Sequence, residues 1–502
     1  MPKALGQHFD LLIVGGGING AGIARDAAGR GLKVLLVEQD DLAAHTSSAS
    51  TKLIHGGLRY LEQGDLRLVS ESLIEREVLL RIAPHIISPL QFVLPQSGSA
   101  RPAWLVRLGL LIYDHLGGRS PLPRTRSVQL VDDAFGSGLR ERRGNAFVYY
   151  DCLVADSRLV VLNAVDAARR GAEVRTRTQF VLAERREGHW VASLRDTAGE
   201  HQVRAKVLIN AAGPWVGEIF ERLGGVRSRR RVRLVKGSHI VLPRLYAGEH
   251  AYVIQNPDRR VVFAIPFEKD FTLIGTTDSA WKGPPGNALI EPHETNYLLK
   301  TVTRTFSRPV SLSDICWTYS GIRPLYDDGA QSASTVTRDY VLDLDEGGAA
   351  LLSIFGGKIT TYRRLAERAL QRFAHLFPDL KGPWTDRVAL PGGEFAGGFE
   401  AYRTSLISRY PALPAPLLER LARSYGNRTE QLLADASTMA DLGEVFGSDL
   451  TQREVDYLIA EEWAQSAQDI LFRRSKLGLH VPAGTAARLD AYVRSHDHAA
   501  PT

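Results

Sequence analysis

The sequence predicts an α/β fold in which an amino-terminal β-α-β unit starts a parallel sheet. A short apolar run, residues 9–14, breaks into a glycine-rich turn, residues 15–20, and a helical pattern follows. A second apolar run, residues 33–37, ends at Glu38. A strand, a G-x-G-x-x-G turn, a helix and an acidic residue about 20 positions further on are the fingerprint of a dinucleotide-binding unit of the Rossmann type.

Each residue of this fingerprint has a physical role. Gly15 permits the tight turn, Gly17 lets the backbone approach a pyrophosphate, and Gly20 lets the helix pack closely on the strand. The amino terminus of that helix then faces the phosphates. Glu38 is placed to bind a ribose hydroxyl, and the absence of an arginine beside it argues against a 2'-phosphate and therefore against NADP.

Size and composition indicate an ordinary globular chain of about three domains, with 502 residues and 44% apolar content. The two cysteines, Cys152 and Cys316, form neither a disulfide framework nor a metal motif, so we expect no metal and a reducing, cytoplasmic compartment. The net charge of +6 suits an anionic partner without naming one. Because no recognition motif accompanies the basic residues 227–233, we expect a solvated loop there and no nucleic-acid partner.

No apolar run approaches the roughly 18 residues of a membrane span, and no export signal precedes residue 9. The apolar segment 104–116 is short and contains Arg107, so we interpret it as a packed helix rather than an anchor. Another helix is expected from about residue 66 to 81, closed by Pro84. The chain is therefore expected to be neither exported by an ordinary signal nor integral to a membrane.

Later segments predict the other layers. A helix is expected within residues 151–171, with strands at 172–176 and from 180 onwards. Alternating residues between 232 and 277 predict antiparallel hairpins, which suggest a separate layer that carries the substrate. Two more apolar runs end in small residues near 211–213 and 356–361. Beyond a glycine-rich linker, residues 390–398, only helices are expected, one of them capped by Thr451 and Glu454.

Five motifs in order, at residues 14–20, 50–61, 236–240, 319–324 and 355–363, resemble the FAD-dependent respiratory glycerol-3-phosphate dehydrogenases, a branch of the glutathione-reductase-like and D-amino-acid-oxidase-like flavoproteins. The resemblance implies FAD, oxidation of sn-glycerol 3-phosphate to dihydroxyacetone phosphate, and electron delivery to membrane quinone. It also implies a cytoplasmic protein held peripherally on the inner face of the cell membrane, and it allows a homodimer. Amphipathic helices and residues 229–233 are the candidates for the attachment.

The resulting fold prediction is a glutathione-reductase-like Rossmann-type FAD-binding domain, an antiparallel substrate domain and a carboxyl-terminal helical domain. The expected boundaries are 1–85, 150–225 and 318–388 for the first domain, 86–149 and 226–317 for the second, and 389–502 for the third. Cofactor contacts are expected from Gly15, Gly17, Asn19, Gly20, Glu38, Thr46, Ser47, Ser50, Lys52, Leu53, Val181, Ala211, Gly213, Gly357, Lys358 and Thr360.

A phosphate monoester carries roughly −1.5 to −2 charges, so its pocket needs more than one cation, and guanidinium groups suit its oxygens. Arg59 and Arg323 have glycine or proline neighbours and are expected in loops, and the matching positions in the family contact substrate phosphate. Tyr60, His55 and Lys358 are the other expected substrate contacts.

Oxidation of an alcohol also requires a group that takes up the hydroxyl proton or stabilises the alkoxide. His239 is the first candidate for the base, although a purely structural histidine at the start of a strand is nearly as good an interpretation. Lys358 at a helix entrance is the second candidate, His55 is the third, and Arg323 completes the catalytic set. The sequence does not rank these groups by geometry.

Three alternatives to a quinone-linked dehydrogenase stay open. One is an oxidase of the same fold that passes electrons to oxygen, another is a non-catalytic flavin-binding scaffold, and the last is an amine or amino-acid oxidase. Calcium control, known in the mitochondrial branch of the family, is not expected. Asp343 and Asp345 begin a loop of the right kind, but Ile354 occupies the twelfth position, where a bidentate glutamate is needed.

Overall fold

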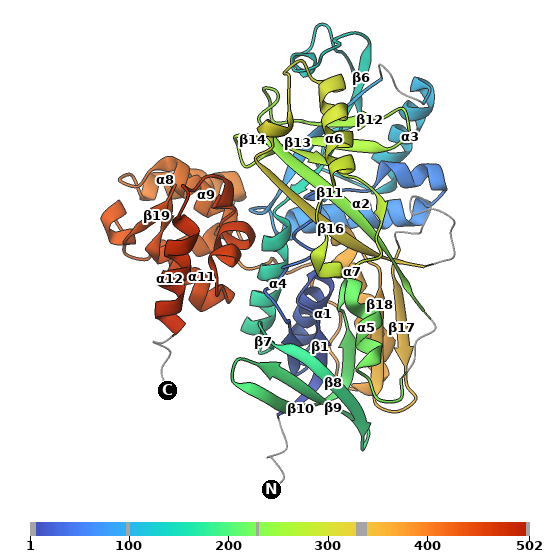
Figure 1. Cartoon of the computed structure of the whole chain (residues 1–502), viewed down its shortest axis with the longest axis vertical. Coiled ribbons are helices and arrows are strands. Elements are labelled where there is room, and N and C mark those ends of the chain that lie inside the picture. The colour runs from blue at the N-terminus through green and yellow to red at the C-terminus, as the bar shows by residue number, and fades with distance from the viewer. Residues whose placement is uncertain (1–6, 97–100, 227–229, 328–338, 498–502) are drawn as a thin grey trace.

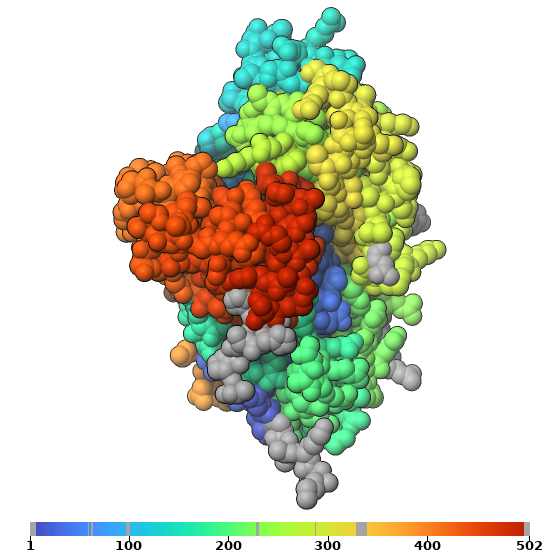
Figure 2. All heavy atoms as spheres, turned by 60° about the vertical axis from the view of Figure 1, so that its left-hand side comes forward, coloured from blue at the N-terminus to red at the C-terminus, as the bar shows by residue number. Residues whose placement is uncertain are grey.

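The structure is a computed structural model that describes residues 7–96, 101–226, 230–327 and 339–497. Figure 1 shows two sheet-based layers stacked along the long axis of the molecule and a helical domain that projects from one side. In Figure 2 the same helical domain, coloured orange to red, stands out from the body as a separate lobe. The chain therefore has the mixed α/β architecture and the helical carboxyl-terminal domain that the sequence predicts.

The first sheet contains the predicted parallel sheet. Its strand order is β17-β18-β10-β1-β2-β7, and all of these except β17 run parallel to their neighbours. Its strands are β1 (His8–Val14), β2 (Val34–Val37), β7 (Glu173–Arg175), β8 (Gln179–Arg186), β9 (His189–Asp196), β10 (Gly199–Asn210), β17 (Val341–Asp345) and β18 (Ala350–Phe355). Both faces are covered, which is why β2 and residues 11–14 of β1 are apolar without alternation.

Helices cover one face of this sheet, and the hairpin β8–β9 with α5 covers the other. The helices are α1 (Ile18–Gly29), α4 (Asp156–Arg169), α5 (Val216–Glu221) and α7 (Tyr362–Phe373). The helix expected within residues 151–171 begins later than the pattern suggested, because residues 151–154 still belong to β6. Asp151 pairs there with Leu90 of β4, and this pairing extends its backbone.

The second sheet is largely antiparallel, with the order β15-β11-β14-β13-β12-β4-β6-β3; β16 pairs with β11 and β5 with β6. Its strands are β3 (Leu53–Ile54), β4 (Ile87–Pro95), β5 (Arg126–Gln129), β6 (Asn145–Val154), β11 (Val232–Pro243), β12 (Ala251–Gln255), β13 (Val261–Phe267), β14 (Phe271–Gly275), β15 (Ser279–Ala280) and β16 (Trp317–Tyr326). The expected hairpin turn at 268–270 joins β13 to β14. Since all of β16 pairs with β11, the boundary predicted at residue 318 falls inside this strand and needs correction.

Helix α6 (Pro292–Thr305) packs on one face of the second sheet, and α2 (Leu66–Ile82) and α3 (Ala103–Leu116) pack on the other. The predictions of α2 and α3 are confirmed to within one residue at each end. For α3 the interpretation as a packed helix is only half right. Val106, Leu110 and Tyr113 face inward, whereas most of its other side chains are exposed.

The carboxyl-terminal domain has its own apolar core. Its helices are α8 (Phe399–Arg409), α9 (Ala415–Tyr425), α10 (Thr429–Leu433), α11 (Gln452–Glu462) and α12 (Thr485–Asp497). The expectation of helices alone was wrong, because β19 (Val445–Gly447) and β20 (Leu450–Thr451) form a small hairpin. Thr451 caps α11 as expected, and its hydroxyl accepts a hydrogen bond from the Glu454 amide.

Buried ion pairs hold this domain against the first sheet. Arg474 donates to both carboxylate oxygens of Asp41, at 2.7 and 2.9 Å, and Arg158 of α4 pairs with Glu462 of α11. All four side chains are almost completely buried. Removing one partner would leave the other charged and desolvated, so these pairs fix the position of the domain.

Candidate active site

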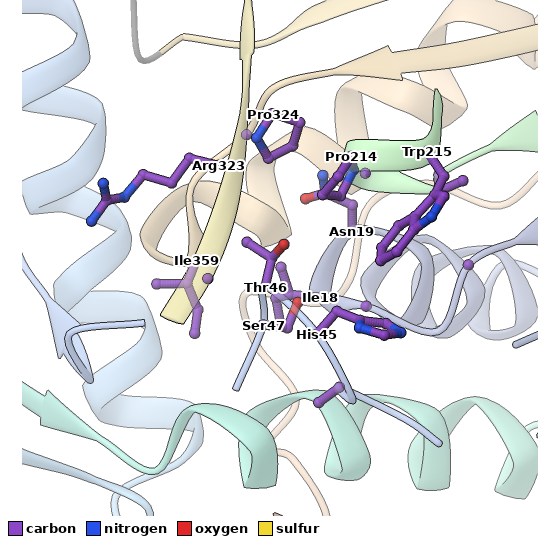
Figure 3. Close-up of a pocket in the computed structure, with 18 of the residues that line it drawn as sticks. Ile18, Asn19, His45, Thr46, Ser47, Pro214, Trp215, Arg323, Pro324 and Ile359 are labelled. Carbon is purple, nitrogen blue, oxygen red and sulfur yellow. Dashed lines mark hydrogen bonds between the residues drawn. The ribbon is translucent and has the colours of Figure 1, made fainter. Parts of the chain in front are cut away.

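A cavity lies where the carboxyl ends of β1, β2, β10 and β18 meet the second sheet, the usual ligand position in a parallel α/β sheet. Of the residues expected to touch a cofactor or substrate, those on its wall are Gly15, Gly17, Asn19, Glu38, Thr46, Ser47, Ser50, Leu53, His55, Tyr60, Ala211, Gly213, Arg323, Gly357, Lys358 and Thr360. Figure 3 shows Arg323 reaching to the opposite side of this pocket from Trp215.

The glycine-rich turn has the geometry that its sequence requires. Gly15 has a φ of +115°, and a Cβ there would lie 2.6 Å from the Ala211 carbonyl oxygen. A Cβ on Gly20 would lie 1.9 Å from the carbonyl oxygen of Gly15, so Gly20 permits helix packing and does not line the cavity. Gly17 is the N-cap of α1, and the helix amino terminus opens onto the cavity wall.

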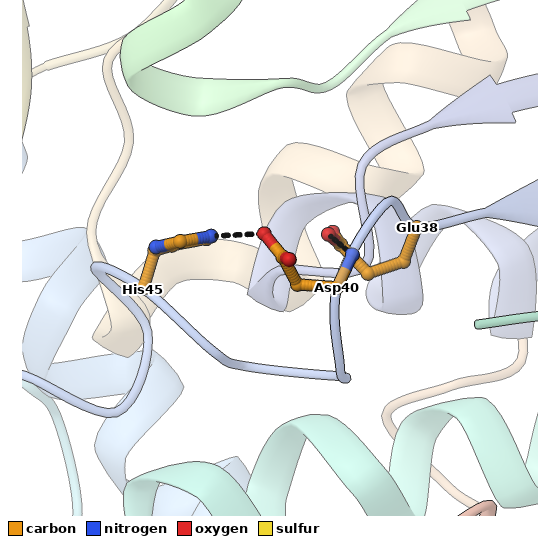
Figure 4. Close-up of side chains that lie close together, drawn as sticks. All are labelled: Glu38, Asp40 and His45. Atoms are coloured by element: carbon orange, nitrogen blue, oxygen red, sulfur yellow. Dashed lines mark hydrogen bonds and ion pairs between the residues drawn. The ribbon is translucent and has the colours of Figure 1, made fainter. Parts of the chain in front are cut away.

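Glu38 stands at the end of β2, where its carboxylate accepts hydrogen bonds from the amides of Gly16, at 2.7 Å, and Asp40, at 2.8 Å. Burial raises the pKa of this carboxyl group, and the two amide hydrogen bonds oppose that effect. Asp40 is engaged by His45 at 2.8 Å, as Figure 4 shows. These hydrogen bonds within residues 38–45 hold the Glu38 carboxylate in place. In this fold, that is the position at which a dinucleotide ribose binds.

The wall also contains a polar atom that a cofactor would satisfy. Asn19 donates from Nδ2 to the Gly356 carbonyl oxygen at 3.2 Å, but its buried Oδ1 accepts no hydrogen bond within the described part of the chain. A buried acceptor without a donor is costly, so it indicates a ligand that carries hydroxyl or amide hydrogens. Together with the close backbone approach at Gly15 and Gly17, this atom fits a bound dinucleotide such as FAD.

Besides Gly20, two expected cofactor contacts lie away from the cavity wall. Lys52 is buried away from the cavity, where its Nζ lies 2.9 Å from Asp156 Oδ2 and 2.9 Å from the Ser48 carbonyl oxygen. Its ammonium therefore holds the loop of residues 46–52 in shape, because a buried lysine needs a carboxylate partner. Val181 is also absent from the wall, and the neighbouring Phe180 and Thr178 line it instead.

The wall also contains residues that were not among the expected contacts, chiefly His45, Thr51, Pro214 and Trp215. The rings of His45 and Trp215 lie 4.6 Å apart and form part of the wall, as Figure 3 shows. The signal for Trp215 was present, since it follows the small-residue turn at 211–213 that was expected to approach the cofactor.

Cationic and aromatic side chains gather at the substrate end. Arg323 of β16 donates to Asp278 Oδ1 at 2.7 Å and to Thr276 Oγ1 at 2.9 Å. Lys358, in the turn after β18, has its Nζ 4.5 Å from the centre of the Tyr60 ring and 3.2 Å from Ser72 Oγ. The side chain of Arg59 lies outside the described residues.

The two candidate histidines occupy different positions. His239 of β11 is fully buried and lies behind the cavity wall. Its Nε2 is 3.0 Å from Oγ1 of Thr51, which does line the cavity, and its ring stacks on Tyr319 at 4.7 Å. Burial, with help from Arg323 and Lys52, holds the pKa of His239 well below 6.5.

His55 lines the cavity directly. Burial and the nearby Lys358 lower the pKa of His55 to about 3. Both imidazoles are therefore neutral near pH 7, and a neutral imidazole can accept a proton.

Comparison with known proteins identifies the family of this chain. The family model described as "FAD dependent oxidoreductase" matches residues 10–363, and the model for the "C-terminal domain of alpha-glycerophosphate oxidase" matches residues 383–494. A D-erythritol 1-phosphate dehydrogenase of Brucella abortus is 51% identical, with 98% of each chain covered. A glycerol-3-phosphate dehydrogenase of Pseudomonas aeruginosa is 50% identical over 98% of this chain and 97% of the relative.

Among relatives and solved structures, two more are informative. The aerobic glycerol-3-phosphate dehydrogenase of Escherichia coli is 48% identical, with 96% of this chain and 97% of the relative covered. The glycerol-3-phosphate dehydrogenase of Bacillus halodurans, solved in complex with FAD, superposes with a TM-score of 0.73 at 26% identity, over 98% of this chain and 88% of that one. The chain belongs to the FAD-dependent oxidoreductases and, within them, to the glycerol-3-phosphate dehydrogenase family.

Proposed function

We propose that this enzyme oxidises sn-glycerol 3-phosphate to dihydroxyacetone phosphate. The observation that carries the proposal is the pairing of a dinucleotide turn with a cationic end in one cavity, where Arg323 and Lys358 face the same space as Gly15 and Gly17. Bound FAD supplies the hydride acceptor for the C2 hydrogen of the substrate. The relatives named as glycerol-3-phosphate dehydrogenases support the choice of substrate.

The substrate phosphate is held by cations at the end of the cavity that contains Tyr60 and Lys358. A phosphate with nearly two negative charges suits the planar fork of Arg323 and the ammonium of Lys358. Arg59 precedes Tyr60 in the same turn, so its guanidinium is the proposed further phosphate contact. The Asp278 carboxylate orients the Arg323 guanidinium, which lines the cavity.

The hydroxyl proton leaves to a neutral imidazole. His239 remains the first candidate, and its hydrogen bond with Thr51 supplies a route, because the Thr51 hydroxyl lines the cavity and passes a proton to Nε2. His55 and Lys358 touch the cavity directly and are the alternatives. Flavin-reduction kinetics of the corresponding alanine variants separate these candidates.

D-Erythritol 1-phosphate is the second candidate substrate, because a relative of 51% identity is named for it. Both compounds are phosphate monoesters of short polyols. A cationic end that binds the phosphate accommodates either of them, so the choice depends on the room beyond the reacting carbon.

The electron acceptor is proposed to be membrane quinone, and the protein is proposed to act from the cytoplasmic side as a peripheral protein of the inner membrane face, with a homodimer as its assembly. The family resemblance supports these assignments. None of the helices in the described ranges is long and apolar enough to cross a membrane. Oxygen is the alternative acceptor, favoured by the oxidase name of the family model that matches residues 383–494.

Anaerobic flavin bleaching tests the proposal. The purified yellow protein is mixed with glycerol 3-phosphate, D-erythritol 1-phosphate or unphosphorylated glycerol, and the fastest bleaching identifies the substrate. The reduced protein is then split into two portions, and one is mixed with a soluble quinone and the other with oxygen. Faster reoxidation by quinone supports a dehydrogenase, faster reoxidation by oxygen identifies an oxidase, and a flavin that no substrate bleaches would leave the scaffold interpretation.

A further inference from the structure

Successive residues of β11 face opposite sides of the second sheet. Lys236 and Ser238 point towards α6, where their side chains contact Glu294 at 3.0 and 3.1 Å. Gly237 lies between them on the other face, and a Cβ at this position would lie 2.3 Å from Nη2 of Arg323. The Arg323 guanidinium, which lines the cavity, therefore passes over β11 at a residue that has no side chain.

Three consecutive residues between β14 and β15 hold the guanidinium in this position. Arg323 donates to Thr276 Oγ1 at 2.9 Å, to Asp278 Oδ1 at 2.7 Å and to the Thr277 carbonyl oxygen at 3.4 Å. We call residues 276–278 the arginine clamp. Because a long arginine side chain has many rotamers, its contacts with the clamp decide where its planar fork points.

The side chain of Thr277 joins the clamp to the helix layer of the second sheet. Its hydroxyl donates to Glu294 Oε1 at 2.7 Å and accepts a hydrogen bond from the Ser238 amide at 2.9 Å. Thr277 and Glu294 are each only 1% exposed. One buried hydroxyl therefore ties the middle of the clamp to both β11 and α6.

Glu294 lies in the first turn of α6, which packs against β11 and β14. Burial by itself would raise the pKa of this carboxyl group. Hydrogen bonds from the Glu291 amide, the Thr277 hydroxyl and the Lys236 ammonium outweigh that effect and hold the pKa of Glu294 below its ordinary value of 4.5. The carboxylate is therefore charged near pH 7, and a charged acceptor binds the Thr277 hydroxyl more strongly than a neutral one would.

We propose that Glu294 and Thr277 are positioning residues for Arg323: the Glu294 carboxylate fixes the arginine clamp, and the clamp aims the guanidinium at the phosphate of the substrate. Lys236 neutralises the buried Glu294 charge, and Gly237 leaves room for the guanidinium. The inference rests on the proposed function for the identity of the anion, a phosphate monoester. The positioning itself applies to any phosphate that Arg323 binds.

A purely structural role is the other interpretation of Glu294, because it forms a capping box with Glu291 at the start of α6. Such a cap stabilises the helix and has no connection with Arg323. Two substitutions separate the roles. Glu291→Ala removes the capping side chain, whereas Thr277→Val keeps the cap and removes the hydroxyl that links Glu294 to the clamp.

Calorimetric titration of the oxidised holoenzyme with inorganic phosphate tests the proposal without any turnover. We expect Thr277→Val and Glu294→Gln each to weaken phosphate binding about tenfold, the size of effect typical of a lost hydrogen bond to a charged group. Thr277→Ser keeps the hydroxyl and should restore the wild-type affinity. In an Arg323→Ala background, Thr277→Val should change the phosphate affinity by less than about twofold, because a residue that acts through Arg323 is coupled to it.

The KM for glycerol 3-phosphate should rise with the phosphate dissociation constant while kcat changes little, and Glu291→Ala should lower the melting temperature without changing the phosphate affinity. The flavin spectrum checks that each variant is folded. Wild-type phosphate affinity in Thr277→Val would overturn the proposal, as would an equal loss with and without Arg323. A wild-type protein that binds phosphate but is not bleached by glycerol 3-phosphate would reject the proposed function, while the calorimetry still decides the role of the clamp.

Discussion

Tyr113 and Asp151 form a buried pair that joins α3 to the substrate end of the cavity. The Tyr113 hydroxyl donates to the Asp151 carboxylate, at 2.7 Å from Oδ2, and accepts a hydrogen bond from the Gly56 amide at 2.8 Å. Arg76 also donates a hydrogen bond to the Asp151 carboxylate, at 2.7 Å from Oδ1. Gly56 follows His55 in the turn that leads to Tyr60, so the pair determines the shape of that turn.

Tyr113→Phe removes the hydroxyl that accepts a hydrogen bond from the Gly56 amide, at a cost of about 0.5–1.5 kcal/mol. We expect the KM for glycerol 3-phosphate to rise with a smaller change in kcat, because the turn loosens while the reacting groups remain. Steady-state kinetics measure this split. Tyr150→Phe is the control, since its hydroxyl bonds Gln91 and not the turn. Equal effects from both variants would remove Tyr113 from a positioning role.

Arg323→Ala should raise the KM for the phosphorylated substrate strongly, since unpairing a desolvated charge typically costs roughly 2–5 kcal/mol. The variant removes the proposed phosphate fork and also leaves Asp278 without the guanidinium that it binds at 2.7 Å. Substrate titration of flavin bleaching gives the affinity directly. Arg233→Ala, in which β11 loses its ion pair with Asp327 just after β16, is the control. Unchanged affinity in Arg323→Ala would exclude it from the phosphate site.

His239→Ala should slow flavin reduction about 100-fold at saturating substrate, the size of effect expected for a lost general base, with less effect on binding. His55→Ala, measured in the same stopped-flow assay, ranks the competing histidine. Because burial holds the pKa of His239 well below 6.5, the imidazole stays neutral above pH 6 and gives the rate no acid limb between pH 6 and 9. Reduction of His239→Ala at the wild-type rate would reject the base assignment.

His85 should make the protein sensitive to acid. Both of its ring nitrogens are buried without a hydrogen-bond partner among the described residues, and burial lowers the pKa of His85 to about 3. The unfolded chain, with a histidine pKa of about 6.5, therefore binds the proton first, so this group costs stability as the pH falls below 6.5.

As the pH falls from 6 to 4, we expect the free energy of unfolding of His85→Leu to rise relative to that of the wild type. The expected rise is about 1.4 kcal/mol for each pH unit. Urea unfolding at a series of pH values measures this difference. The difference at pH 8, where the histidine is neutral in the folded and unfolded states, gives the effect of the substitution on packing and is subtracted. A difference that does not change with pH would show that His85 is not buried in its neutral form.

Arg474→Ala should destabilise the protein by about 3–5 kcal/mol, because it leaves Asp41 buried next to the cofactor loop with one fewer cation. Asp41 lies between Glu38 and His45, so FAD retention should fall as well, measured by the flavin released on gel filtration. Arg488→Ala, whose exposed pair with Glu444 contributes about 0–1 kcal/mol, is the control. If both variants melt at the same temperature, the interdomain pair is not a main contact.

The sequence by itself determined the parts that local geometry controls. The turn from Gly15 to Gly20 could be predicted because only glycine tolerates the φ at Gly15 and the close approach at Gly20. The strands β1 and β2, the position of Glu38 and the helix α2 followed from apolar runs and periodicity. The five ordered motifs identified the family, and with it FAD, before any distance was known.

Only the tertiary structure decided where side chains point. Lys52 lies among the predicted cofactor contacts in sequence, yet its ammonium binds Asp156 from a distant helix. His239 is separated from the cavity by Thr51, and α3 keeps an apolar face that no other described element covers. Hydrophobic periodicity records which faces are apolar, but partners far along the chain decide which of those faces are buried and which charges are paired.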